Sequence, residues 1–175
     1  DDAIKICIKK AIKKNIACVT LKKANHIGRL ADFTNQAAKK NMIGIAFSNL
    51  HGTSHIVAPF GGIDRKLPTN PIAVSAPGPK KNDIFEMDLS TSATAEGKVK
   101  INYNLKKSME KGFIIDNYGK STRNPKDLYL DPKGAILPLG GLAGHKGFAL
   151  ALAVDVLGGA LSTAGCTSIK KNQHG

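Results

Sequence analysis

The sequence of 175 residues is 42% hydrophobic and 22% charged, which fits one globular domain or a large part of one. Its formal net charge of +13 attracts anions, whether nucleic acid, acidic membranes or nucleotides. Only three of the 26 basic residues are Arg, the side chain that base and phosphate recognition favours, so we do not expect a nucleic-acid partner. Three widely spaced cysteines without a CxxC pair predict neither a zinc site nor a disulfide framework. They favour a reducing compartment, and we expect a cytoplasmic protein without a metal.

Hydrophobic periodicity predicts an alternation of helices and strands over the first 50 residues. Ile4, Ile8 and Ile12 recur at intervals of four with Lys between them, a pattern typical of an amphipathic helix. The expected segments are, in order, a helix over 3–14, a buried strand over 16–21, a polar loop over 22–29, a helix over 29–40 and a strand over 42–49. This order indicates the α/β class.

The rest of the chain has Gly- and Pro-rich stretches between short apolar segments. We expect, in order, no regular structure over 50–70, strands over 72–77 and 84–89, a helix from about Ser92, a loop over 113–134 and a buried helix over 148–161. The first of these stretches, 21 residues long, is unusual in a compact domain and is either functional or wrongly assigned. The last apolar run is too short to span a bilayer and contains Asp155, so we expect no membrane segment.

The chemistry-bearing residues of the first half are dispersed. The sequence has no GxGxxG after a strand, no GxxxxGK[ST], no GxSxG and no HExxH. His26 follows a predicted strand, at the kind of position where α/β proteins bind ligands, and a neutral imidazole there can accept a proton from a substrate hydroxyl. Arg29 lies three residues on and could hold a substrate carboxylate by a bidentate pair. The alternative is a surface His and a solvated Arg.

Two further segments suit an anionic ligand. Asp88 ends a predicted strand and precedes a run of hydroxyl side chains at a helix start, so it could accept a hydrogen bond from a ribose hydroxyl; plain N-capping is the alternative. Lys146 lies in the stretch GGLAGHKG before the last helix, where an ammonium group and backbone N–H groups could face a pyrophosphate. Here the alternative is a Gly-rich turn before a core helix.

Five blocks share an order and spacing with a known family. They are HIGRLADF, VAPFGG followed by TNPIAVSAP, FEMDLSTSATAEGKV, GKSTRNPKDLY and GAILPLGGLAGHKGFALALAVDVLGGALS. Together they resemble the malate/L-lactate dehydrogenase family of the second type, over about residues 3–166. The resemblance implies one NAD(P)-binding, catalytic region over 1–175, built as a mixed sheet with flanking helices in a non-Rossmann fold. It also implies a homodimer that transfers a hydride between NAD or NADP and a small 2-hydroxy or 2-oxo acid such as malate or L-lactate.

Carried over block by block, the resemblance assigns roles to single residues. His26 takes the position of the proton-transferring His. The cofactor-binding positions are Asp88, Leu89, Ser90, Lys146 and Gly147. Arg29 as the substrate carboxylate ligand is our own hypothesis. Family chains extend further at both ends, and Pro68 stands where they usually have Gly. The alternatives are a cyclic-imine carboxylate reductase of the same family, an inactive fragment, and a basic nucleic-acid-binding module.

Overall fold

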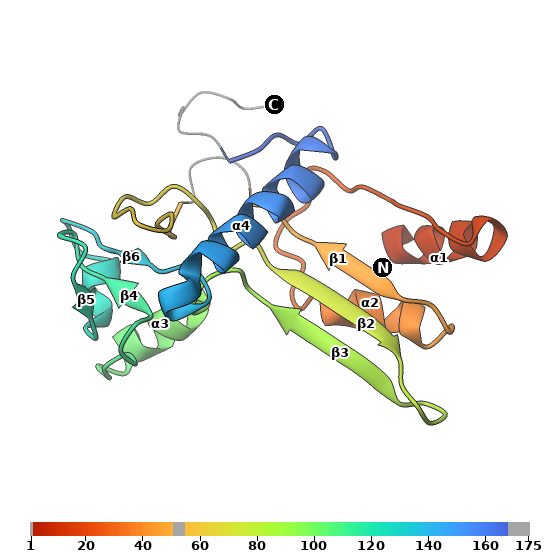
Figure 1. The fold of residues 1–175 in the computed structure, drawn as a ribbon, viewed down its shortest axis with the longest axis horizontal. Helices are drawn as coiled ribbons and strands as arrows, with labels where there is room; N and C mark the ends of the chain where they lie inside the picture. Colours follow the sequence, from red (N-terminus) through yellow and green to blue (C-terminus); the bar gives the residue numbers. More distant parts are fainter. Residues whose placement is uncertain (1, 51–54, 168–175) are drawn as a thin grey trace.

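A three-stranded antiparallel sheet and two helices form the N-terminal half of the fold. The computed structural model describes residues 2–50 and 55–167. The elements of this half are α1 (Asp2–Lys14), α2 (Ala31–Ala38), β1 (Gly44–Phe47), β2 (Ile72–Pro77) and β3 (Ile84–Leu89), with the strands in the order β1-β2-β3. In Figure 1, α2 lies behind the sheet, while α1 stands farther out to the side. One face of the sheet is therefore covered by α2.

The two faces of this sheet differ because successive side chains of a strand alternate. Ser75 of β2 pairs in register with Gly44 of β1 and Glu86 of β3, and these three positions face α2. A Cβ atom on Gly44 would lie 2.7 Å from the carbonyl oxygen of Thr34, so this glycine lets α2 pack closely. The opposite face is apolar. Its side chains include Ile45, Phe47, Val74, Phe85 and Met87.

The second half contains a smaller antiparallel sheet and the main hydrophobic core. Its elements are α3 (Glu96–Asn104), β4 (Ile114–Ile115), β5 (Ser121–Thr122), the 3-10 helix η1 (Pro125–Leu128) and β6 (Ala135–Ile136), with the strands in the order β5-β4-β6. The buried core residues are Val57, Leu67, Val99, Met109, Ile114, Leu128, Ile136 and Ala151. Arg65 ties this region together: Nε donates to the carbonyl oxygen of Gly134 at 2.6 Å, and Nη2 donates to that of Leu128.

Tyr129 joins η1 to α3. Its hydroxyl donates to the Glu96 carboxylate at 2.6 Å, and the Lys100 ammonium lies 4.6 Å from the centre of its ring. Burial, together with the hydrogen bond to Glu96, raises the pKa of Tyr129 above its ordinary value. The hydroxyl therefore stays protonated and remains a donor at neutral pH.

Helix α4 (Gly144–Val154) crosses in front of both halves in Figure 1. It follows a short 3-10 turn, η2 (Gly141–Ala143), and continues into a π-helical turn, η3 (Asp155–Ala160). A Cβ atom on Gly147 would lie 2.1 Å from the carbonyl oxygen of Leu139. Helix α4 can therefore pack against the Leu139 backbone only because residue 147 has no side chain. The predicted burial of this helix is correct for one face only, because Leu152 and Val156 on the other face are exposed.

The structure confirms most of the longer elements that the sequence predicts. The helix near the N-terminus, the helix before β1, and the strands at 72–77 and 84–89 are confirmed. The α/β class is confirmed as helices on small sheets, but both sheets are antiparallel rather than mixed. Parallel pairing in the described residues is limited to an isolated bridge between Val57 and Ile136. Within the described part of 50–70 there are only isolated bridges, and residues 51–54 lie outside that part.

Three expectations are wrong in detail. Residues 16–21 form no strand, and Ile16 and Leu21 are exposed, because no neighbouring strand pairs with this segment. Helix α3 begins at Glu96 rather than near Ser92, and its N-cap residue Ala95 makes no side-chain cap. The expected loop over 113–134 contains β4, β5 and η1. Across residues 2–50 and 55–167, no helix has the length and apolar character needed to cross a membrane.

Candidate functional site

His26 lies on an exposed loop whose C-terminal end leads into the buried start of α2, and whose Lys22 side chain donates to the Thr163 hydroxyl at 3.3 Å. Residues 21–29 are all exposed, whereas Leu30 and Ala31 are buried at the start of α2. The backbone N–H of Gly28 donates to His26 Nδ1 at 3.1 Å, and Gly28 has a left-handed φ of 80°. A glycine suits this turn because other residues are strained at positive φ. The loop thus presents the imidazole to solvent, with Nδ1 already engaged.

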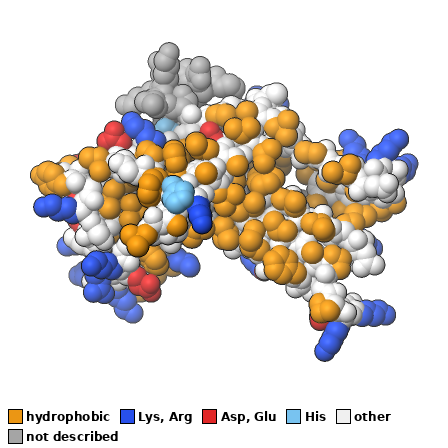
Figure 2. All heavy atoms as spheres, in the orientation of Figure 1, with side chains coloured by type: hydrophobic (Ala, Val, Ile, Leu, Met, Phe, Trp, Pro, Cys, Tyr) orange, Lys and Arg blue, Asp and Glu red, His pale blue; other side chains and the backbone are white. Residues whose placement is uncertain are grey.

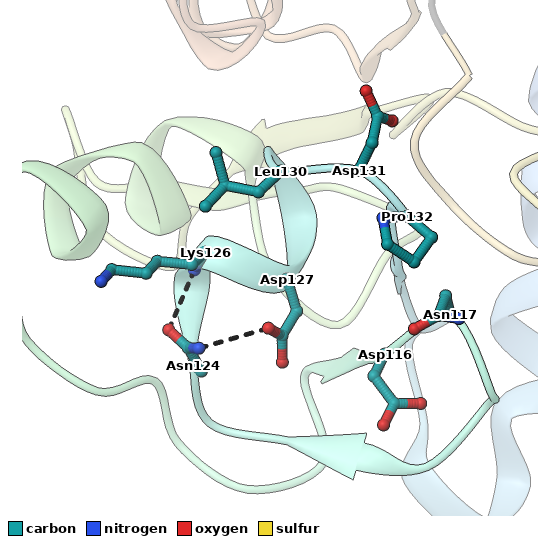
Figure 3. A pocket seen from close by; sticks show the side chains of 8 residues that line it. All are labelled: Asp116, Asn117, Asn124, Lys126, Asp127, Leu130, Asp131 and Pro132. Atoms are coloured by element: carbon teal, nitrogen blue, oxygen red, sulfur yellow. Dashed lines mark hydrogen bonds between the residues drawn. The ribbon is translucent and has the colours of Figure 1, made fainter.

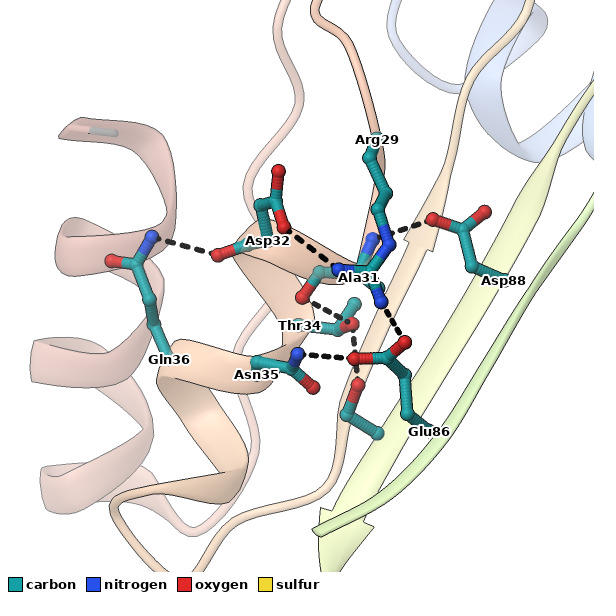
Figure 4. A network of polar contacts seen from close by, with 9 residues as sticks. Arg29, Ala31, Asp32, Thr34, Asn35, Gln36, Glu86 and Asp88 are labelled. Atoms are coloured by element: carbon teal, nitrogen blue, oxygen red, sulfur yellow. Dashed lines mark hydrogen bonds and ion pairs between the residues drawn. The ribbon is translucent and has the colours of Figure 1, made fainter.

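A network of polar contacts joins the end of this loop to β3 (Figure 4). Arg29 Nη1 lies 3.1 Å from an oxygen of Asp32, and Arg29 Nη2 donates to Glu86. The second oxygen of Glu86 accepts from the side-chain amide of Asn35. Asp88, two residues further along β3, accepts from the backbone N–H of Ala31 at 2.8 Å. Two carboxylates of β3 therefore hold Arg29 and the first residue of α2, Ala31.

Asp88 thus caps a helix, as in the alternative to the predicted ligand role, but this helix is α2 and not α3, which follows Asp88 in sequence. A carboxylate at a helix N-terminus satisfies a free N–H group and interacts favourably with the helix dipole. Only Oδ2 of Asp88 is used; within the described residues Oδ1 has no hydrogen-bond partner. One oxygen of this carboxylate therefore remains for a ligand.

The hydroxyl run after β3 forms hydrogen bonds within its own loop. Ser90 Oγ lies 2.9 Å from Ser92 Oγ, and Ser92 Oγ donates to the carbonyl oxygen of Thr94 at 2.8 Å. Thr91 donates through both its backbone N–H and its hydroxyl to the carbonyl oxygen of Thr69 at 3.0 Å. These bonds shape the loop that leads away from Asp88 and the half-buried Leu89.

Backbone hydrogen bonds bring this loop beside the Gly-rich segment before α4. The N–H of Leu139 donates to the carbonyl oxygen of Thr91 at 3.0 Å, and the N–H of Ala93 donates to that of Leu137 at 2.8 Å. The loop that follows Asp88–Ser90 and the segment that precedes Lys146 and Gly147, far apart in sequence, are thereby adjacent. No hydrogen bond among the described residues joins His26 to either of them.

Lys146 lies in the first turn of α4 and is exposed. Within the described residues it has no hydrogen-bond or ion-pair partner. Its neighbour His145 meets the Phe60 ring edge to face, with ring centres 5.6 Å apart. Gly140 has a φ of 117°, and Gly147 is buried against Leu139. An unpaired ammonium group at a helix N-terminus suits a phosphate.

A cavity of about 340 Å³ lies elsewhere, between η1 and the turn after β4 (Figure 3). It is lined by Asp116, Asn117, Asn124, Lys126, Asp127, Leu130, Asp131 and Pro132. Asp116 and Asp127 already accept hydrogen bonds from nearby N–H groups. Over the described ranges, no three or more His, Cys, Asp or Glu side chains are placed to hold a metal ion. None of the predicted site residues lines this cavity.

Sequence reasoning missed Glu86, which is the main partner of Arg29. Glu86 and Asp88 alternate on one predicted strand, which places them on the same face, and that spacing is the one signal that pointed to a joint role. Their partners lie more than 50 positions away, so the neighbouring sequence could not indicate them.

Comparison with known proteins gives a consistent result over nearly the whole chain. The sequence model described as malate/L-lactate dehydrogenase matches residues 1–175. A malate dehydrogenase of Pyrococcus abyssi is 37% identical over 98% of this chain and 47% of that protein. The solved malate dehydrogenase of Pyrococcus horikoshii has a TM-score of 0.76 at 36% identity, over 95% of this chain and 43% of that one.

A third similar protein is named for a different substrate. The solved delta1-piperideine-2-carboxylate reductase of Pseudomonas syringae has a TM-score of 0.84 at 27% identity, over 99% of this chain and 50% of that one. Helices packed on small antiparallel sheets place the chain in the α/β class, and these similarities identify its family. The chain belongs to the malate/L-lactate dehydrogenase family. It spans about half the length of the relatives that it matches.

Proposed function

We propose that this protein transfers a hydride between NAD or NADP and a small 2-hydroxy or 2-oxo acid, such as malate or L-lactate. The observation that carries the proposal is that the loop after Asp88–Ser90 lies beside the segment before Lys146 and Gly147, in a chain that belongs to the malate/L-lactate dehydrogenase family. The unpaired ammonium of Lys146 and the free Oδ1 of Asp88 fit a ligand that carries both phosphates and ribose hydroxyls.

His26 is the proposed proton-transfer residue. When a 2-hydroxy acid is oxidised, the hydroxyl proton would pass to the imidazole of His26; when a 2-oxo acid is reduced, His26 would return it. Bound NAD(P) would supply the hydride acceptor or donor, and the protein would supply orientation and the proton. The exposed loop and the free Nε2 of His26 support this role.

Asp88, Leu89 and Ser90 at the end of β3, with Lys146 and Gly147 at the start of α4, are the proposed cofactor-binding residues. Because Gly147 is buried against Leu139, it would contribute its backbone rather than any surface of its own. The antiparallel sheets support a binding mode other than that of a Rossmann fold, whose sheet is mostly parallel.

Arg29 is the proposed ligand of the substrate carboxylate. Its guanidinium group already contacts two carboxylates of the chain, so the substrate would have to replace one of them. Asp32 is the easier one to replace, because its side chain is 63% exposed and that of Glu86 is 31% exposed.

Three further proposals, on the oligomeric state, the compartment and a second activity, start from the family. A homodimer is proposed, and the exposed apolar side chains of the sheet and of α4 support it. A reducing compartment such as the cytoplasm is consistent with three free cysteines. Reduction of a cyclic-imine carboxylate is the second candidate activity, favoured by the likeness to the piperideine-carboxylate reductase.

The first test is the substitution His26→Ala in the purified protein. We expect kcat with a 2-oxo acid and NADH or NADPH to fall by at least about 100-fold, because a general acid is lost. The dissociation constant of the cofactor should stay unchanged. Asn25→Ala, at the exposed position before His26, is the matched control and should keep full turnover. Undiminished turnover in the His26 variant would overturn the assignment.

A further inference from the structure

Helix α4 carries two of the proposed cofactor-binding residues, Lys146 and Gly147, yet a single hydrogen bond connects it to distant segments of the described part of the chain. In that bond the side-chain amide of Asn70 donates to the carbonyl oxygen of Ala151 at 3.1 Å. The other contacts of α4 with distant segments are close packing, such as that of Gly147 against Leu139. Packing has no preferred direction. A hydrogen bond does, so it also restricts rotation and sliding of the helix.

The backbone on either side of Asn70 is bonded to two other segments. The carbonyl oxygen of Thr69 accepts from both the N–H and the hydroxyl of Thr91, each at 3.0 Å. The carbonyl oxygen of Pro71 accepts from the N–H of Ser48 at 3.1 Å. Because Thr91 belongs to the loop after β3, the amide of Asn70 connects α4 to a backbone that is itself bonded to that loop.

Asn70 has the properties of a support rather than of a ligand. Its residue surface is 1% exposed, so the side chain cannot meet a cofactor directly. Within the described residues its Oδ1 has no hydrogen-bond partner, and an unpaired buried acceptor costs free energy. The donor half of the amide, which binds the Ala151 carbonyl, is therefore the half that this position uses. The φ of 36° is left-handed, a conformation that Asn and Gly adopt more readily than other residues.

We propose that Asn70 is a positioning residue for the cofactor site: its hydrogen bond to Ala151 sets where the start of α4 lies relative to the end of β3. The proposal rests on the proposed function, in which Asp88–Ser90 and Lys146 bind the cofactor together. Groups on two elements bind one ligand tightly when they are held at the right separation before it arrives. Without the bond, α4 would sample several positions, and the fraction of molecules ready to bind would fall. The competing explanation is that Asn70 only stabilises the fold.

The test uses Asn70→Gly, which keeps the backbone conformation at a φ of 36° but removes the amide. The matched control is Tyr129→Phe, which also loses one hydrogen bond between two segments, here to Glu96, and neither residue belongs to α4. Dissociation constants of NADH and NADPH are measured by fluorescence titration at a temperature at which thermal unfolding shows every variant to be folded. We expect the constant to rise about fivefold in Asn70→Gly, the factor that corresponds to the net free energy of one hydrogen bond. It should stay unchanged in Tyr129→Phe.

A second readout needs no cofactor. Residual dipolar couplings of the backbone N–H groups report how α4 is oriented relative to the sheet of β1, β2 and β3. We expect the couplings of α4 to shrink in Asn70→Gly while those of the sheet stay the same, because a helix that samples several orientations averages them. Tyr129→Phe should match the original protein in both sets.

Asn70→Asp keeps the size of the side chain but not the donor. It should behave like Asn70→Gly, which excludes a cavity as the cause, and it takes the place of that variant should the cavity prevent folding. Unchanged α4 couplings, or a dissociation constant that rises no more than in Tyr129→Phe, would overturn the positioning role. Failure of the proposed function would be seen separately, because the original protein would then bind neither NADH nor NADPH while the couplings still test the role of Asn70.

Discussion

At Gly147, a single hydrogen in place of a side chain sets how closely α4 approaches the segment before it. An added Cβ would lie 2.1 Å from the Leu139 carbonyl oxygen and 2.7 Å from the Leu139 nitrogen. Backbone atoms cannot move aside as the tip of a side chain can. The same close contact keeps the Gly-rich segment beside the loop after β3, because the Leu139 N–H is bonded to the Thr91 carbonyl oxygen. Packing and the proposed cofactor site thus depend on the same residue.

Gly147→Ala should therefore destabilise the protein. We expect a loss of about 1–3 kcal/mol in the free energy of unfolding, the usual cost of overpacking, measured by urea denaturation. Gly97→Ala is the matched control, because Gly97 lies in α3 with no atom within 4 Å of an added Cβ. That control should gain up to about 1 kcal/mol, since Ala is the better helix former. Equal urea midpoints for Gly147→Ala and the original protein would contradict the close contact.

Single residues also show where prediction from sequence fails. Arg29 stays a predicted ligand of the substrate carboxylate, but sequence reasoning did not find the two carboxylates of the chain that contact it. Nothing in the neighbourhood of Arg29 in sequence indicates Glu86, because a contact between a loop and a strand 57 positions away depends on how the chain folds. Lys146 is exposed, and its phosphate-facing role stays a prediction.

Among the elements, α2 depends on a residue of another element for its N-terminal cap. Leu30, at the N-cap position, forms no side-chain cap, and the Ala31 N–H is satisfied by Asp88 of β3 instead. The eight-residue helix is too short to be stable alone, so its contacts with the sheet decide its stability. Asp88 therefore links sheet and helix before any cofactor is considered.

Asp88→Ala should destabilise the cofactor-free protein by about 1 kcal/mol, the typical cost of losing a helix N-cap. Asp88→Asn, which keeps an acceptor oxygen but loses the charge, should cost less. Both values come from urea denaturation without cofactor. The control is Asp64→Ala, which removes an exposed carboxylate paired with Lys66 and should change stability by less than about 0.5 kcal/mol. A stability of Asp88→Ala as high as that of this control would show that Asp88 does not cap α2.

The elements that were predicted correctly are those with a clear pattern of their own. Short apolar segments between Gly- and Pro-rich stretches predicted the observed bounds of β2 and β3, 72–77 and 84–89, and the spacing of four predicted α1. The segment 16–21 is as apolar as these strands, yet it forms none, because a strand also needs a partner for its backbone. The two-residue strands β4, β5 and β6 are too short to produce a periodic pattern, so sequence reasoning described them as loop.

For the whole molecule, the main feature that sequence did not predict is a broad apolar face. Figure 2 shows hydrophobic side chains along α4 and across the sheet beside it, on the side that α2 does not cover. The exposed members include Ile45, Phe85, Leu152, Val156 and Leu157. The apolar run of α4 predicts a buried helix, because composition cannot distinguish burial within a chain from burial against another surface. Contiguous apolar surface of this kind marks interaction sites.

We expect this apolar face to be the contact surface of the proposed homodimer, and the substitution Phe85→Lys tests that expectation. Phe85 is 57% exposed on the apolar side of β3, near the start of the strand, so a charge there would have to be desolvated in any interface that covers this part of the sheet. We expect the original protein to sediment as a dimer, and Phe85→Lys to shift the dimer dissociation constant upward by about 10-fold or more. Ile101→Lys is the matched control, because Ile101 is 59% exposed on α3, away from this face, and it should leave association unchanged. Sedimentation of the original protein as a monomer at every concentration would contradict the homodimer, and equal weakening by both substitutions would place the contact surface elsewhere.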